Sequence, residues 1–193
     1  MKAIWTGTDS LFLVKFPKQL KKTKIFYVLA LRLFARITDF FAQEHYSCGE
    51  LVENNLRKFG MKKKIAQFED ILWYPDKIEK KPHEGINVLY YYPKKDTKFN
   101  RWLYGKDVFE KIRFYVDRYC ENVNFIVVDG TANMKEIYPI VDILIRPNRH
   151  DGHPRMVDEC SLNGIKVVST NENPYFAEFF EKIVCHENIR LRK

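Results

Sequence analysis

The second half of this 193-residue chain contains four short apolar runs, each separated from the next by a helical or mixed segment. The runs occupy residues 86–92, 124–130, 141–147 and 166–170. Gly85 and Pro93 bound the first run, as turn residues commonly bound a buried strand. Between the first and second runs we expect a basic loop over residues 94–101, and then residues 105–118 carry apolar side chains at helical spacing. Strands that alternate with helices predict a Rossmann-like parallel sheet with right-handed crossovers.

The first part of the chain has a different pattern. We expect a turn at residues 7–10 and a long helix over residues 25–41. A second helix is expected over residues 47–59, because Ser47 stands three residues before Glu50 as a capping box and Gly60 follows the last apolar position. One short strand and an exit loop should follow, which are too few strands for a second complete α/β domain.

A charged segment, DKIEKKPHEG at residues 76–85, is the expected linker. The sequence therefore predicts an α/β protein with two parts. Residues 1–80 form a partial, mostly helical segment with the linker, and residues 81–193 form a Rossmann-like domain.

Composition limits the function classes. The formal net charge of +8 points to an anionic partner such as phosphate, nucleic acid or anionic lipid, while 46% hydrophobic residues argue against disorder. The four cysteines form no Cys-x-x-Cys pair, so we expect them to be reduced. No signal peptide and no run of about 18 apolar residues is found. These features favour a cytoplasmic protein.

Two acids stand out in the segment RPNRHDGHPRMVDECSLNGIKVVST, residues 146–170. Asp151 lies in a Gly-Pro turn, and Glu159 stands eight positions later in the expected helix. Both acids could face one pocket at the carboxyl edge of a sheet, where α/β folds bind nucleotides. An isolated pair of this kind more often marks a loop followed by a surface helix. His150 and His153 flank Asp151, but no further ligands follow at zinc-type spacing.

Several segments carry a resemblance to a known family. HDGHPRMVDE, NGIKVVST and NENPYF follow one another after the third strand, and WTGTD and SCGELVENNLRKFG precede them. This order is similar to that in GT-B-fold glycosyltransferases, in particular glycosyltransferase family 4, and it covers nearly the whole chain. Residues 81–193 correspond to the donor-binding half, and residues 1–80 to the end of the acceptor-side half. The family's Glu-x7-Glu motif appears here as Asp151 and Glu159.

The resemblance implies roles for individual residues. Glu159 would accept hydrogen bonds from the ribose hydroxyls, and Asp151 would hold hydroxyls of the donor sugar; these are the two expected catalytic residues. Backbone amides that open the helix would meet the diphosphate, whose charge grows as the sugar leaves. A basic pair would assist them, with Lys106 as one member. The expected donor-binding residues are Lys94, Lys95, Lys98, Lys106, Asp129, Gly130, Arg149, His150, Gly152, His153, Pro154, Arg155, Met156 and Val157.

The same resemblance implies a retaining, metal-independent transfer from a nucleotide-diphosphate sugar to a glycan, lipid or protein acceptor, with no further cofactor. A complete GT-B enzyme is roughly twice as long, and its early acceptor-side strands are missing here. We therefore expect a homo-oligomer, or a partner that supplies the missing half. The apolar run at residues 12–16 lies among lysines, which favours either a partner or a peripheral membrane contact.

Two other functions remain open. A nucleic-acid-binding protein would fit the positive charge and the aromatic residues interleaved with it, and its binding would depend steeply on salt. No helix-turn-helix, zinc or RNP pattern supports this hypothesis, so we consider nucleic acid the weaker partner. The third possibility is a catalytically silent protein that binds nucleotide sugars.

Overall fold

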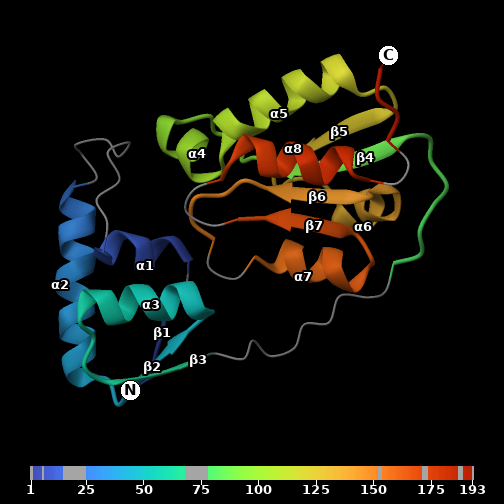
Figure 1. Ribbon diagram of the computed structural model, residues 1–193. Coiled ribbons are helices and arrows are strands. Elements are labelled where there is room, and N and C mark those ends of the chain that lie inside the picture. Colours follow the sequence, from blue (N-terminus) through green and yellow to red (C-terminus); the bar gives the residue numbers. More distant parts are fainter. Residues whose placement is uncertain are drawn as a thin grey trace. The chain divides into compact units, whose positions relative to one another are not determined.

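The computed structural model describes residues 2–5, 7–14, 25–67, 78–151, 154–170, 174–186 and 189–192. The chain divides into two compact units, which are treated separately below (Figure 1). The first unit comprises Met1–Trp73 together with His150–Pro154, and the second comprises Tyr74–Arg149 together with Arg155–Lys193.

A four-stranded parallel sheet forms the centre of the second unit. Its strands are β4 (Ile86–Tyr91), β5 (Val123–Val128), β6 (Ile143–Arg146) and β7 (Lys166–Ser169), in the spatial order β5-β4-β6-β7. Every neighbouring pair is parallel. The four strands expected from the apolar runs are thus confirmed, as is the parallel α/β architecture.

Helices cover both faces of this sheet. They are α4 (Lys98–Leu103), α5 (Lys106–Tyr119), α6 (Met134–Ile137), the 3-10 helix η2 (Tyr138–Ile140), α7 (Arg155–Leu162) and α8 (Phe176–Val184). Side chains of α5 and α8 pack on one face, and those of α6, η2 and α7 pack on the other. In Figure 1, α5 is seen above the strands and α7 below them.

Alternation along β4 explains why both faces are covered. Val88 and Tyr90 pack with α5 and α8, whereas Leu89 packs toward α6 and α7, and all three are fully buried. A strand that is apolar on both faces must be covered on both sides, as parallel sheets usually are. The Tyr90 ring also stacks on Phe109 at a centroid distance of 4.0 Å, and its hydroxyl donates to the Tyr104 carbonyl at 2.9 Å.

Two segments of the second unit differ from expectation. Residues 98–103 form helix α4 where a basic loop was expected, because the Thr97 side chain caps the helix by accepting from the Asn100 amide. The described part of the expected linker, residues 78–85, belongs to the second unit and packs on its other elements. The amide of Ile78 donates to Asn163 Oδ1 at 2.6 Å, and the amide of Lys81 donates to the Pro139 carbonyl at 2.9 Å.

The first unit has a sheet of its own. Strands β1 (Lys2–Trp5), β2 (Glu44–Ser47) and β3 (Lys64–Gln67) are parallel in the order β1-β2-β3. Helix α1 (Gly7–Val14) packs on α2 (Ile25–Phe41) and on α3 (Glu50–Phe59). The core is made of Trp5, Leu13, Ala35, Val52, Leu56, Met61 and Ile65.

Sequence patterns predicted parts of this unit wrongly. Residues 7–10 begin helix α1 where a turn was expected. Ser47 does not cap a helix, because pairing with β1 and β3 places it at the end of β2. Helix α3 begins at Glu50 after Gly49, which makes no side-chain cap. The long helix over residues 25–41 is confirmed as α2.

A buried polar network joins the elements of the first unit. Trp5 Nε1 donates to His45 Nδ1 at 3.1 Å, and His45 Nε2 lies 2.8 Å from Asp39 Oδ1. Asp39 also accepts from the amides of Lys62 and Lys63. Burial alone would raise the pKa of Asp39, but these hydrogen bonds outweigh it and lower the pKa below its ordinary value of 3.8. The network therefore ties α2 to both β1 and β2.

We predict that Asp39→Asn destabilises the first unit by about 1–3 kcal/mol, because a neutral amide is a weaker acceptor for a buried histidine and two amides. A lowered folded-state pKa means that the stabilisation is present above the unfolded-state pKa and is lost as the pH falls through the folded-state value. The loss of unfolding free energy in Asp39→Asn, relative to the wild type, should therefore be largest near neutral pH and should shrink below about pH 4. Urea unfolding at several pH values measures both effects; an equal deficit at every pH would contradict this role of the charge.

Candidate functional site

The strand order of the second unit reverses direction at the neighbouring strands β4 and β6. The chain leaves β4 toward β5 on one side, and leaves β6 toward β7 on the other side. The carboxyl ends of β4 and β6 are neighbours, since Tyr90 pairs with Ile145. Crossovers that diverge from neighbouring strands leave room for ligands at their carboxyl ends in open α/β sheets.

Lys106 lies at this edge, at the start of α5 after Gly105. Its Nζ donates to Asp96 Oδ2 at 2.8 Å and lies 4.5 Å from the centre of the Tyr92 ring. Asp96 also accepts from the Tyr92 hydroxyl at 2.6 Å and from Arg101 at 3.0 Å. The hydrogen bond from Lys106 is the largest of the effects that lower the pKa of Asp96 to about 2. The expected phosphate-binding cation is thus held by a carboxylate that a phosphate would have to replace.

The other expected basic residues follow β4, and Asp129 follows the neighbouring strand β5. Lys94, Lys95 and Lys98 are exposed in the segment that follows β4. Asp129 follows β5 and accepts from the hydroxyl and the amide of Thr131 at 2.6 and 3.0 Å. These hydrogen bonds lower the pKa of Asp129, and the charge of Lys94 adds to the effect. Asp129 thus makes the local contacts that are typical of a turn after a strand.

Arg149 links the segment after β6 to the start of α5 through hydrogen bonds and an ion pair. Its guanidinium donates to both carboxylate oxygens of Asp107 at 2.8 and 2.7 Å, and to the Trp102 carbonyl at 2.8 Å. Gly105 packs against the same segment, because a Cβ there would lie 1.8 Å from the Pro147 carbonyl oxygen. Arg149 therefore holds the segment after β6 against the start of α5, and its charge is already paired with Asp107.

Glu159 lies on α7, partly buried, and accepts a short hydrogen bond from the Tyr138 hydroxyl of η2. Burial, and then this hydrogen bond, raise the pKa of Tyr138 well above its usual range. The side chain of Arg146, at the carboxyl end of β6, is buried on the same face of the sheet and donates to Met156 Sδ at 3.8 Å. Its charge also opposes the raised pKa of Tyr138. A tyrosine, a carboxylate and a buried arginine thus gather where β6 meets α7.

The motif residues between Arg149 and Glu159 fall into both units. His150 is buried and Asp151 is partly buried, and both group with the first unit together with Pro154. Arg155, Met156 and Val157 form the first turn of α7 in the second unit. Gly152 and His153 lie outside the described residues. Asp151 and Glu159 therefore belong to different units.

The second unit brings several predicted residues to its carboxyl edge. Lys106, Arg149 and the first turn of α7 follow the neighbouring strands β4 and β6, and Glu159 lies one turn further along α7. The sequence reasoning missed Arg146, Tyr138 and Asp96. A charged residue that directly ends a buried strand is a signal that identifies Arg146, whereas nothing in the sequence marks Tyr138 or Asp96.

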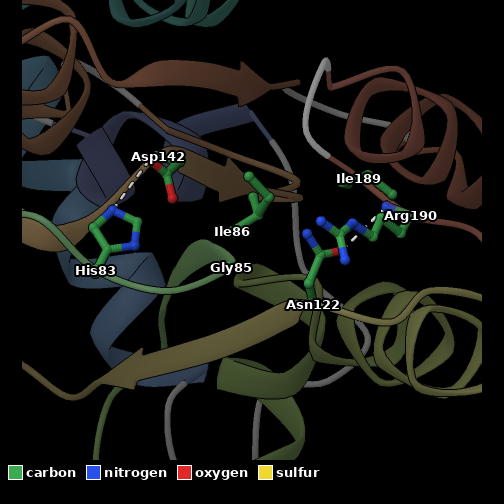
Figure 2. A pocket seen from close by; sticks show the side chains of 7 residues that line it. All are labelled: His83, Gly85, Ile86, Asn122, Asp142, Ile189 and Arg190. Carbon is green, nitrogen blue, oxygen red and sulfur yellow. Dashed lines mark hydrogen bonds and ion pairs between the residues drawn. The ribbon is translucent and has the colours of Figure 1, made fainter.

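A cleft of about 500 Å³ lies at the opposite edge of this sheet (Figure 2). Gly85 and Ile86 stand at the amino end of β4, and Asn122 stands before β5. His83 Nε2 lies 3.4 Å from Asp142 Oδ1 on one side of the cleft, while Asn122 accepts from the Arg190 amide at 3.1 Å on the other. Ligands of open α/β sheets bind at the carboxyl edge, so this cleft is the less favoured site.

Among the described residues, no group of three or more His, Cys, Asp or Glu side chains is placed to hold a metal ion. The four cysteines are free thiols, and burial raises the pKa of Cys160 to about 12. No helix in the described ranges is long and apolar enough to cross a bilayer. Comparison with protein-family models gave no match, and comparison with curated proteins found none similar to this chain.

We predict that Gly105→Ala lowers the stability of the second unit by about 3 kcal/mol or more, because it combines backbone strain with a clash against Pro147. Gly164→Ala is a matched control, since Gly164 has a similar positive φ of 67° but no atom within 4 Å of its Cβ position. The control should lose only about 1–2 kcal/mol of stability. Urea unfolding followed by circular dichroism gives both values. Equal losses would contradict the close approach of α5 to the segment after β6.

Proposed function

We propose that the second unit binds a nucleotide-diphosphate sugar at the carboxyl ends of β4 and β6, as the donor-binding part of a GT-B-type glycosyltransferase. The observation that carries this proposal is the diverging pair of crossovers after β4 and β6. Cationic and carboxylate side chains, including Lys106, Arg146 and Glu159, lie on the elements that flank it. Nucleotide recognition needs both kinds of group, cations for phosphate and a carboxylate for ribose.

Glu159 is the proposed ribose ligand. A carboxylate has two oxygens and several lone pairs, so the oxygen that accepts from Tyr138 leaves the other available to ribose hydroxyls. Tyr138 also fixes the direction of the side chain before the ligand arrives. Pre-orientation of this kind lowers the entropic cost of binding.

The diphosphate would meet Lys106 and the first turn of α7. The amides of Arg155, Met156 and Val157 open an eight-residue helix, and such amides together with the helix dipole favour an anion. Lys106 would exchange its bond to Asp96 for a bond to phosphate. Because Asp96 is exposed and Lys106 is partly exposed, solvent screens this pair, and we expect the exchange to have a modest energetic cost.

The proposed reaction is a retaining, metal-independent transfer. The bond between the sugar anomeric carbon and the diphosphate oxygen breaks, and a bond from the same carbon to an acceptor oxygen forms on the same face. The acceptor proton passes to the departing phosphate. The acceptor would be a glycan, a lipid or a protein. Binding without transfer would instead make the chain a nucleotide-sugar sensor.

We predict that Glu159→Ala weakens the binding of UDP or GDP, whichever binds the wild type, by about ten- to a hundredfold. The loss corresponds to about 1.5–3 kcal/mol for hydrogen bonds to a charged group. Glu159→Gln keeps an acceptor for Tyr138 and should lose nearly as much affinity. Glu178→Ala, on the exposed face of α8, is the control and should bind as the wild type does. Isothermal titration calorimetry gives the affinities.

Unchanged affinity in the Glu159 variants would show that the ribose assignment is wrong. If neither UDP nor GDP binds the wild type, and DNA or RNA binds with a steep salt dependence, the nucleic-acid hypothesis replaces this one.

A further inference from the structure

Helix α2 of the first unit is apolar around nearly its whole circumference. One stripe, which includes Val28, Ala35 and Thr38, is buried against the rest of the unit. The opposite stripe is formed by Phe26, Leu29, Leu33, Ile37 and Phe40, whose exposed fractions lie between 48% and 80%. These five positions are three or four residues apart, so they share one face of the helix. We call this stripe the outer face of α2.

The outer face carries no charge, because each charged side chain of α2 is turned to its own unit. Arg32 Nε donates to the Phe12 carbonyl at 3.1 Å. Arg36 donates to the carbonyls of Phe59 and Gly60 at 2.7 and 2.9 Å. Asp39 lies in the buried network with His45. A solvent-exposed apolar face of this extent is typical of an interaction site.

Exposed cations lie at the carboxyl end of the outer face, and three lysines precede α2 in the sequence. At its carboxyl end, the amides of Lys62 and Lys63 bond Asp39 of α2, and the side chains of Lys62, Lys63 and Lys64 are exposed. In the sequence, Lys21, Lys22 and Lys24 directly precede the first residue of α2. The described residues thus place positive charge at the carboxyl end of an uncharged stripe, and the sequence directly before the stripe is also basic.

We propose that the outer face of α2 docks the protein on an anionic lipid surface. The helix would lie in the plane of the membrane, with Phe26, Leu33 and Phe40 at the boundary of the acyl chains. Interfacial helices bind through buried apolar area together with electrostatic attraction to anionic lipids. The inference is independent of the donor site proposed for the second unit.

Charge distribution argues against a second copy of the chain as the occupant. If two α2 helices packed antiparallel through their outer faces, the exposed lysines at the carboxyl end of each would meet the start of the other helix, which a basic sequence directly precedes. Parallel packing would place the two carboxyl ends side by side, with their exposed lysines facing each other. Both arrangements oppose like charges, whereas an anionic surface is complementary to both ends at once.

Cosedimentation with lipid vesicles tests the proposal. The full chain should bind vesicles of equimolar phosphatidylcholine and phosphatidylglycerol, and should bind pure phosphatidylcholine much more weakly. Leu33→Gln combined with Phe40→Gln should lower the partition coefficient by at least about tenfold, because two large apolar side chains no longer enter the lipid. Both positions are exposed, so the variant should fold, which circular dichroism checks. Phe114→Gln, on an exposed position of α5, is the matched control and should bind as the wild type does.

The lysines have their own variant. Lys62→Glu combined with Lys63→Glu should lower binding to the anionic vesicles by about tenfold and leave the weak binding to phosphatidylcholine unchanged; Lys111→Glu on α5 is the charge control. Absence of wild-type binding, or equal binding by the α2 variant, would overturn the proposal. A dimer in analytical ultracentrifugation that the α2 variant abolishes, without lipid binding by the wild type, would instead show that the outer face pairs two copies.

Discussion

The pairing of β4 with β6 is the constraint on which the second unit depends. Both strands are buried on both faces, and their alternating side chains divide the core into two layers. Each strand is followed by a crossover that must return to the sheet on the side of its next partner. Because β5 and β7 lie on opposite sides of this central pair, the segments after β4 and β6 diverge.

That divergence decides which side chains gather at the carboxyl edge. The segment after β4 brings Asp96 and then Lys106, and the segment after β6 brings Arg149 and α7 with Glu159. Two contacts hold these segments in place, the Arg149–Asp107 pair and the approach of Gly105 to Pro147. The candidate site is thus a consequence of strand order, with polar contacts that fix its loops.

The sequence predicted the four strands, α5 and α7 because each has a strong apolar period or a bounded apolar run. It did not predict β1 or β2, because β1 (KAIW) has only a short apolar run and β2 (EHYS) is mostly polar, and pairing on both sides of β2 overrode the capping signal at Ser47. The partners of the site residues could not be predicted either. Tyr138 reaches Glu159 across 21 positions, a contact that exists only once η2 packs on α7. The outer face of α2 could not be predicted, because apolar residues occur at most positions of the helix and the sequence does not show which of them are buried.

Mapping of backbone amide shifts by NMR during titration with UDP and GDP compares the two edges of the same sheet as binding sites. If the second unit binds its donor as proposed, the shifts centre on the carboxyl edge, at residues 92–97, Gly105 to Asp107 and the first turns of α7. Shifts centred on the opposite cleft, at Gly85, Ile86, Asn122 and Asp142, would contradict it.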